Sequence, residues 1–217
     1  VKGKGSGKIF KAVKGVSFEV PKGQILGICG RNGSGKSTLL RAISGIFSAD
    51  SGSINLHGNS ISLLSIGVGF QKKLTGYENI FLSGLLLGYT KEQVEEKIND
   101  IIEFSELGDF IYKPVSSYSS GMYSKLAFSI TAILETDIML IDEVLSVGDI
   151  HFREKSYNKM KELINDSDRT VVIVSHSTKT IVELCDKVIW LHDGLIKDEG
   201  EPAEIMAKYE EYMRSLN

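Results

Sequence analysis

The sequence predicts an α/β fold built around a mainly parallel sheet. Three apolar runs end directly before polar residues: Gln24–Cys29 before a glycine-rich stretch, Ile138–Ile141 before Asp142, and Val171–Ser175 before His176. Runs of this kind are typical of buried parallel strands, whose carboxyl ends meet at one edge of a sheet. Segments with helical periodicity lie between the runs, and strands that alternate with helices indicate an α/β arrangement.

Two short segments are expected to form antiparallel strands beside this sheet. Between Val16 and Val20 apolar and polar residues alternate, which is typical of a strand with one buried face. Gly52–Leu56 is interpreted in the same way. Together they predict an antiparallel β subdomain next to the core.

Helices are predicted where apolar residues recur at helical spacing. The segments concerned are Thr38–Ser44, Lys91–Phe104 and Leu126–Leu134. The second of them carries one apolar stripe, formed by Val94, Ile98, Ile101 and Ile102. Residues from about 73 to 120 are expected to be mostly helical and to form a second lobe.

The last part of the chain predicts a hairpin followed by a helix. Val188–Leu191 and Leu195–Lys197 flank the turn residues at positions 192–194, and the final helix is expected to begin after Pro202. We expect residues 1–217 to form a single domain with the helical lobe as a subdomain.

Composition limits the classes of function. The formal net charge of -3 supplies no general attraction for nucleic acid, so no nucleic-acid partner is expected. The apolar runs are shorter than the roughly 20 residues that span a bilayer, so a membrane location would require a protein partner. Cys29 and Cys185 have no metal-type spacing and are expected to be core residues in a reducing compartment.

The segment GRNGSGKST matches a phosphate-binding loop. In the pattern G-x-x-x-x-G-K-[ST], small residues let backbone N–H groups surround phosphate oxygens, and the lysine, here Lys36, reaches the terminal phosphates. The helix that follows adds its positive N-terminal dipole. The motif predicts a P-loop NTPase core, with nucleotide bound by Gly30, Arg31, Asn32, Gly33, Ser34, Gly35, Lys36, Ser37 and Thr38.

Polar residues at the other strand ends predict the rest of this site. The Ser37 hydroxyl and the Asp142 carboxylate are expected to hold Mg²⁺. Glu143 is either a capping carboxylate or, beside a phosphate loop, a general base for an attacking water. His176 is either an ordinary hydrogen-bonding residue at a strand end or a catalytic one.

Further motifs along the chain complete a known set. They are Gln71, YSSGM (Tyr118–Met122), LIDE (Leu140–Glu143), SVGD (Ser146–Asp149) and VSH (Val174–His176). In this order, beside the phosphate loop, they closely resemble the nucleotide-binding domain of ABC transporters over nearly the whole chain. The resemblance implies ATP and Mg²⁺ as cofactors, ATP hydrolysis as the activity, and a helical signature subdomain.

The same resemblance implies roles for individual residues. Gln71 would sense Mg²⁺ and the attacking water, and His176 would contact the γ-phosphate. Ser119, Ser120 and Gly121 belong to the family signature, which covers ATP bound to the opposite subunit. Two copies would therefore enclose two ATP molecules in a head-to-tail dimer, with Ser146–Asp149 at the seam.

The particular residues in these motifs restrict the resemblance to one subgroup of the family. YSSGM, EVLSVGD and GVGFQKKLTGYENI are similar to ATPases that export O-antigen, capsular polysaccharide or teichoic acid. That subgroup implies a lipid-linked glycan as substrate and an integral membrane permease as partner. It also implies a peripheral location on the cytoplasmic face of the bacterial plasma membrane. The permease is expected to contact the lobe around Phe70–Phe81.

Two departures from the family pattern concern the ends of the chain. No aromatic residue for stacking on adenine lies within Val1–Gly7, and Phe10 is the nearest candidate. A native N-terminal strand before the present start would explain this. Some glycan exporters also carry a C-terminal carbohydrate-binding domain, for which the sequence to Asn217 leaves no room.

Two other functions fit parts of the same motif set. One is a soluble ABC ATPase that acts on ribosomes or DNA repair complexes, although such proteins usually carry two cassettes or a coiled-coil insertion. The other is a nucleotide sensor that does not hydrolyse ATP. The presence of Lys36, Asp142, Glu143 and His176 together argues against the second.

Overall fold

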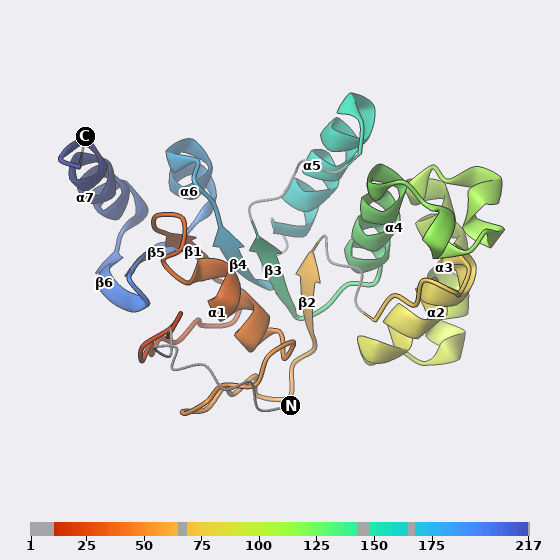
Figure 1. Cartoon of the computed structure of the whole chain (residues 1–217), viewed down its shortest axis with the longest axis horizontal. Coiled ribbons are helices and arrows are strands. Elements are labelled where there is room, and N and C mark those ends of the chain that lie inside the picture. The colour runs from red at the N-terminus through yellow and green to blue at the C-terminus, as the bar shows by residue number, and fades with distance from the viewer. Residues whose placement is uncertain (1–10, 65–68, 143–147, 165–167, 217) are drawn as a thin grey trace, which may run out of the picture.

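In the part of the chain that the structure describes, the strands form one six-stranded sheet in the order β2-β3-β4-β1-β5-β6 (Figure 1). The computed structural model describes residues 11–64, 69–142, 148–164 and 168–216. The first five strands in this order pair in parallel, and β6 pairs antiparallel with β5. The predicted α/β class with a mainly parallel sheet is confirmed. The strands are β1 (Ile25–Cys29), β2 (Ile61–Leu64), β3 (Ile138–Asp142), β4 (Thr170–Val174), β5 (Lys187–His192) and β6 (Leu195–Gly200).

Helices cover both faces of the sheet and build the second lobe. They are α1 (Lys36–Ile43), α2 (Gly76–Leu86), α3 (Lys91–Ser105), α4 (Ser120–Ile133), α5 (Ile150–Ile164), α6 (Thr178–Leu184) and α7 (Pro202–Arg214), with short 3-10 turns at Gly108–Tyr112 and Val115–Ser117. The three predicted helices correspond to α1, α3 and α4. The hairpin β5–β6 and the helix after Pro202 are also confirmed.

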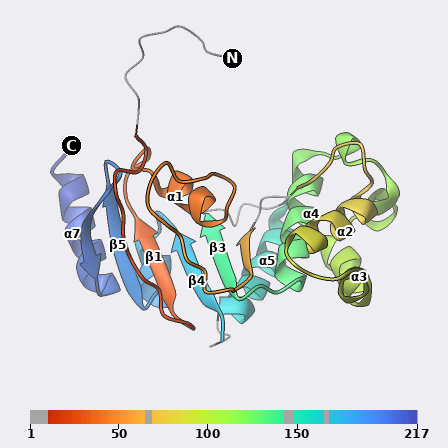
Figure 2. The same ribbon diagram turned by 90° about the horizontal axis from the view of Figure 1, so that it is seen from below.

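Each strand contributes side chains to two separate cores, because alternate residues point to opposite faces. On one face, Met139 and Ile141 of β3 pack in a cluster that includes residues of α4, α5, α6 and α7. On the other face, Leu140 packs in a cluster with Leu39 and Leu40 of α1. Figure 2 shows α1 lying against the sheet. Burial on both faces explains why the strands read as continuous apolar runs.

The helical lobe has its own core beyond β2. Its buried residues come mainly from α2, α3 and α4, and Figure 1 shows these helices on the side of the sheet opposite to β6 and α7. Two of the helices begin with a capping box, in which Thr75 pairs with Glu78 and Thr90 pairs with Gln93. These reciprocal bonds satisfy backbone N–H groups at the helix starts and fix where the helices begin.

The predicted antiparallel strands beside the core do not form. Neither Val16–Val20 nor Gly52–Leu56 forms a strand. The alternating apolar residues do pack against the core on the α1 face, so the pattern correctly indicates one buried side of the segment. They are Val16, Phe18 and Val20. A strand also needs a hydrogen-bonded partner strand, however, and within the described residues neither segment has one. The antiparallel pair of the sheet is β5 with β6.

Across the ranges that the structure describes, no helix is both long and apolar enough to cross a membrane.

Both thiols are expected to resist modification in the folded protein. Cys29 and Cys185 are buried in one core cluster, as predicted, and burial raises the pKa of each thiol to about 12. The thiolate is the reactive form, so at pH 8 a thiol reagent should label neither residue on the timescale that labels a small-molecule thiol. Addition of denaturant should make both react. Rapid labelling without denaturant would contradict the packing.

Candidate functional site

The glycine-rich loop joins β1 to α1 and is held by close backbone contacts. Gly30 has a φ of 150°, and a Cβ there would lie 2.2 Å from the carbonyl oxygen of Leu191. Gly35 has a φ of 105°, and a Cβ there would lie 2.4 Å from the carbonyl oxygen of Ala12. Both positions therefore require glycine, for backbone conformation and for space.

Lys36 places its ammonium group on the loop itself. The side chain is only 6% exposed, and Nζ donates hydrogen bonds to the carbonyl oxygens of Gly30 at 2.7 Å and Arg31 at 2.9 Å. Ser34 adds a buried hydroxyl, which has no hydrogen-bond partner among the described residues. Arg31 and Asn32 are exposed. A positive charge, an unpaired hydroxyl and the start of α1 suit an anionic group such as a triphosphate.

The hydroxyl of Ser37 meets the end of β3. Its Oγ donates a hydrogen bond of 3.2 Å to Oδ1 of Asp142, although the two residues are far apart in sequence. Hydroxyl and carboxylate oxygens are the ligands that Mg²⁺ prefers. Among the described residues no group of three or more His, Cys, Asp or Glu side chains is arranged for a metal ion. The Ser37–Asp142 pair itself supplies oxygen atoms of the kind that Mg²⁺ takes from proteins.

His176 follows β4 at the same edge of the sheet. The parallel register aligns Val174 with Asp142 on one side and with Ile28 on the other. The chain thus leaves β4 level with the phosphate loop and with Asp142. His176 is exposed there, one residue before the Ser177 that caps α6.

Gln71 is held by a buried asparagine that the sequence motifs do not reveal. The backbone N–H of Gln71 donates to Oδ1 of Asn79 at 2.7 Å, and Nδ2 of Asn79 donates to the carbonyl oxygen of Gln71 at 3.1 Å. The same amide nitrogen also donates to the carbonyl oxygens of Leu74 and Thr75. Within the described residues, Gln71 hydrogen-bonds Gly69, Leu74 and Asn79 and not the Ser37–Asp142 pair.

An Asn79→Ala variant is expected to lose about 2–3 kcal/mol of unfolding free energy, because it removes four side-chain hydrogen bonds and leaves the backbone N–H of Gln71 without this partner. Asn79 is 0% exposed. The exposed Asn158 of α5 provides the matched control, and Asn158→Ala should stay within about 0.5 kcal/mol of the native protein. Urea unfolding of both variants tests the difference. Equal stability would show that Asn79 does not anchor this segment.

The signature residues stand at the start of α4. Ser119 is the N-cap of this helix, and its Oγ accepts a hydrogen bond of 3.2 Å from the N–H of Met122. Ser120 is exposed, and among the described residues a Cβ at Gly121 would come within 4 Å of the Ser119 hydroxyl alone, at 3.8 Å. Helix starts attract anions. This start belongs to the lobe beyond β2, whereas the phosphate loop follows β1 in the sheet interior (Figure 1).

Three of the predicted site positions lie outside the described residues. They are Phe10, Glu143 and Ser146. Asp149, the last residue of the SVGD motif, is described and forms an ion pair of 2.8 Å with Lys125. The structure thus brings the phosphate loop, Ser37, Asp142 and the end of β4 to one edge of the sheet.

Comparisons with known proteins agree with this arrangement. A family model described as ABC transporter matches residues 13–146. The chain is 43% identical to the O-antigen export system ATP-binding protein RfbB of Myxococcus xanthus. The 203 matched residues are 94% of this chain and 46% of that protein. It is 44% identical to the teichoic acids export ATP-binding protein TagH of Bacillus anthracis. The 211 matched residues are 97% of this chain and 38% of that protein. The chain therefore spans less than half the length of both relatives.

A solved structure shows the same fold. It is described as a dimeric, post-hydrolysis state of the ATP-binding cassette MJ0796 with ADP and Pi. It superposes with a TM-score of 0.72 at 22% identity, over 92% of this chain and 94% of that chain. Since the family model covers more than half of the 217 residues, the chain belongs to the ABC transporter family.

Proposed function

We propose that this chain is the ATP-binding subunit of an ABC exporter, and that it hydrolyses MgATP to drive export of a lipid-linked polysaccharide. One observation carries the ATPase part. The loop with Lys36, the Ser37–Asp142 pair and the end of β4 converge at one sheet edge. The names of the two relatives support the export part, since one concerns O-antigen and the other teichoic acids.

In this proposal the site residues bind and orient the phosphates and activate the attacking water. Lys36 and the loop N–H groups hold the β- and γ-phosphates, and Ser37 and Asp142 hold Mg²⁺. When bound, the ion supplies charge neutralisation on the phosphate oxygens. His176 contacts the γ-phosphate, Gln71 orients the water and the metal, and Glu143 accepts the proton of the attacking water.

The second half of each site comes from another copy of the chain. The start of α4 is formed by Ser119, Ser120 and Gly121. It lies in the lobe and not beside the phosphate loop of the same subunit, so it would bind a nucleotide held by another copy. A head-to-tail dimer brings this helix start to the γ-phosphate held by the partner copy. The MJ0796 cassette, which shares this fold and is described as dimeric, supports such an arrangement.

The permease is proposed to dock on α2 and the segment before it. Tyr77 stacks with Tyr112 at 5.8 Å and lies 5.4 Å from Phe81, and Tyr112 is 62% exposed. Leu85 and Leu86 are also more than half exposed, whereas Ile80 is fully buried in the lobe. Asn79 of the same helix hydrogen-bonds the backbone of Gln71, so permease binding on α2 can reach the site. The protein would then lie peripherally on the cytoplasmic face of a bacterial plasma membrane.

Purification of the tagged full-length protein from detergent-solubilised membranes of its host tests the export part. We expect a multi-span membrane protein in a near one-to-one ratio with this chain, together with a glycolipid. Mass spectrometry identifies both. Recovery of ribosomes or DNA repair proteins alone would contradict export and leave the ATP chemistry to be judged by a hydrolysis assay with and without Mg²⁺.

A further inference from the structure

The turn between β5 and β6 lies directly against the phosphate loop. Its two central residues are Asp193 and Gly194. The backbone N–H of Gly194 donates a hydrogen bond of 3.0 Å to the carbonyl oxygen of Ser34 in the loop. The carbonyl oxygen of Gly194 accepts a hydrogen bond of 2.7 Å from the N–H of Lys14. Both backbone groups of this buried glycine therefore connect the turn to other parts of the chain.

The segment of residues 11–14 packs between the turn and the loop. A Cβ at Gly35 would lie 2.4 Å from the carbonyl oxygen of Ala12, and a Cβ at Gly194 would lie 2.7 Å from the same oxygen. The turn therefore supports the loop in two ways. It bonds Ser34 directly, and it holds the segment that lies against Gly35.

The hydrogen bond to Ser34 fixes the direction of a loop N–H group. A peptide unit is planar and trans, so its C=O and its N–H point in opposite directions. Because the C=O of Ser34 points to Gly194, the N–H of the next residue, Gly35, points away from the turn. Loops of this kind hold phosphate oxygens through such backbone N–H groups.

The hairpin that carries the turn is itself packed firmly. Trp190 of β5 has its ring 5.5 Å from that of Tyr209 and 5.2 Å from that of Tyr212, both on α7. Nζ of Lys197 in β6 lies 3.6 Å from the ring centroid of Tyr212 and 4.1 Å from that of Trp190. Aromatic and cation–π contacts of this kind add to the stability of the packing. The turn is thus a firm support for the loop.

The conformation of the turn and its contact with Ala12 are separate requirements. Asp193 and Gly194 have φ values of 48° and 79°, and a two-residue hairpin turn with two positive φ values favours the pair Asp-Gly. Asparagine also tolerates this conformation. Contact with Ala12 is a further requirement, because any side chain at Gly194 would place its Cβ against the Ala12 oxygen.

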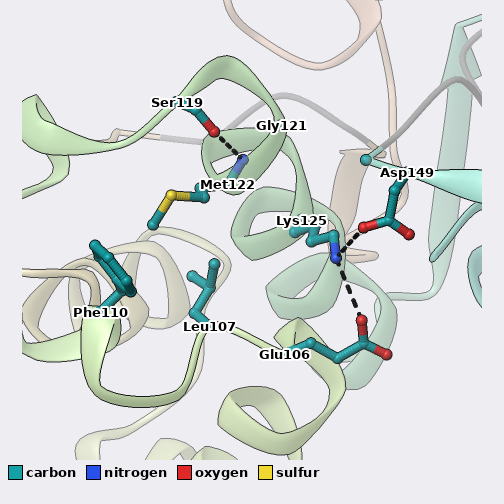
Figure 3. A pocket seen from close by; sticks show the side chains of 9 residues that line it. Glu106, Leu107, Phe110, Ser119, Gly121, Met122, Lys125 and Asp149 are labelled. Carbon is teal, nitrogen blue, oxygen red and sulfur yellow. Dashed lines mark hydrogen bonds and ion pairs between the residues drawn. The ribbon is translucent and has the colours of Figure 1, made fainter. Parts of the chain in front are cut away.

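The turn contacts one half of the proposed two-copy site. Ser119, at the start of α4, lines a pocket together with Lys125 and Asp149 (Figure 3). The described residues that line this pocket include none from the phosphate loop or the turn. A change at Gly194 should therefore affect phosphate binding and leave the chemical step intact.

We infer that Gly194 is a positioning residue for the phosphate loop, which holds the Ser34 carbonyl so that the N–H of Gly35 faces the phosphates of the nucleotide. The inference rests on the proposed function, in which this loop binds MgATP. Gly194 acts through Ser34 and need not touch the nucleotide. Without this support the loop adopts its binding shape for a smaller fraction of the time, and the affinity falls by that fraction.

Three single variants separate support of the loop from stability of the hairpin. Gly194→Ala and Gly194→Asn both place a Cβ against Ala12, so each should raise the Kd for MgADP about tenfold. Asparagine suits the turn better than alanine, so Gly194→Asn should have the higher melting temperature of the two. The matched control is Asp193→Ala, which places alanine at the other left-handed position, where the native side chain is 79% exposed. Its Kd should change by less than about twofold, although its melting temperature falls.

Hydrolysis and hydrogen exchange give two further readouts. In Gly194→Asn the KM for MgATP should rise about tenfold, while kcat stays within about twofold of the native value. The N–H of Ser34 donates to the carbonyl oxygen of Arg31 at 3.1 Å within the loop. Without nucleotide, exchange of this amide should be about fivefold faster or more in Gly194→Asn and unchanged in Asp193→Ala.

A native Kd in Gly194→Asn, or equal losses of affinity in Gly194→Asn and Asp193→Ala, would overturn the inference. Affinities that simply follow the melting temperatures of the three variants would also overturn it, because Gly194 would then serve the hairpin alone. If the native protein binds neither MgADP nor MgATP, the proposed function fails on its own. Exchange of the Ser34 amide then still decides whether Gly194 holds the loop, and unchanged exchange would overturn the positioning role.

Discussion

A Glu143→Gln variant is expected to bind MgATP with near-native affinity while its turnover falls about 100-fold or more. Glu143 directly follows Asp142, the residue that ends β3 and bonds to Ser37. A carboxylate at this point in the chain is suited to accept a proton from the attacking water. Glutamine keeps the size of the side chain and removes its basicity, so only the chemical step should suffer. Steady-state hydrolysis and nucleotide titration measure the two quantities.

The control for this prediction is another glutamate, which lies on a helix. Glu154 belongs to α5 and is exposed, and Glu154→Gln should hydrolyse MgATP at the native rate. If Glu143→Gln also turns over at close to the native rate, Glu143 is not the base. A loss of MgATP binding would instead show that Glu143 supports the nucleotide and not the chemistry.

A Lys36→Met variant should lose MgATP affinity by about 100-fold or more, and turnover with it. The ammonium group of Lys36 donates to the carbonyl oxygens of Gly30 and Arg31, which hold it on the loop that is expected to bind the phosphates. Methionine keeps most of the apolar side chain and removes the charge. The protein should therefore stay folded. Titration with a fluorescent ATP analogue, beside a thermal melt, measures both properties.

The comparison for Lys36 is a lysine away from the loop. Lys22 forms an exposed ion pair of 3.6 Å with Asp168, and Lys22→Met should bind MgATP as the native protein does. Equal affinity of Lys36→Met and the native protein would show that the glycine-rich loop is not the phosphate site.

Local sequence patterns predict most of the sheet and the phosphate loop. The strands β1, β3 and β4 are buried on both faces, so each appears in the sequence as an uninterrupted apolar run. The loop is contiguous, and its glycines are needed for conformation and close contact, so the motif alone specifies it. Even the distant pair Ser37–Asp142 follows from the pattern, because parallel strands end at one edge.

Features that depend on distant neighbours are not visible in the sequence. Val16–Val20 alternates like a strand, yet the pattern reflects packing and says nothing about a partner backbone. The strand β2 has four residues, too few for a clear period, so the sequence does not predict it. Asn79 is a single polar residue within α2, and no sequence motif marks it as the residue that holds Gln71. Glu106 and Lys125 come together only through the packing of α3 on α4.

The central claim is that one active site needs two copies of this chain, and the molar mass in solution tests it most directly. With MgATP, Glu143→Gln should have twice the 23.9 kDa of one chain by light scattering. Adding Ser119→Arg to the same protein should return the mass to one chain, while MgATP still binds at the intact phosphate loop. A double variant that dimerises with MgATP as Glu143→Gln does, or a Glu143→Gln protein that stays monomeric with MgATP bound, would contradict the shared site.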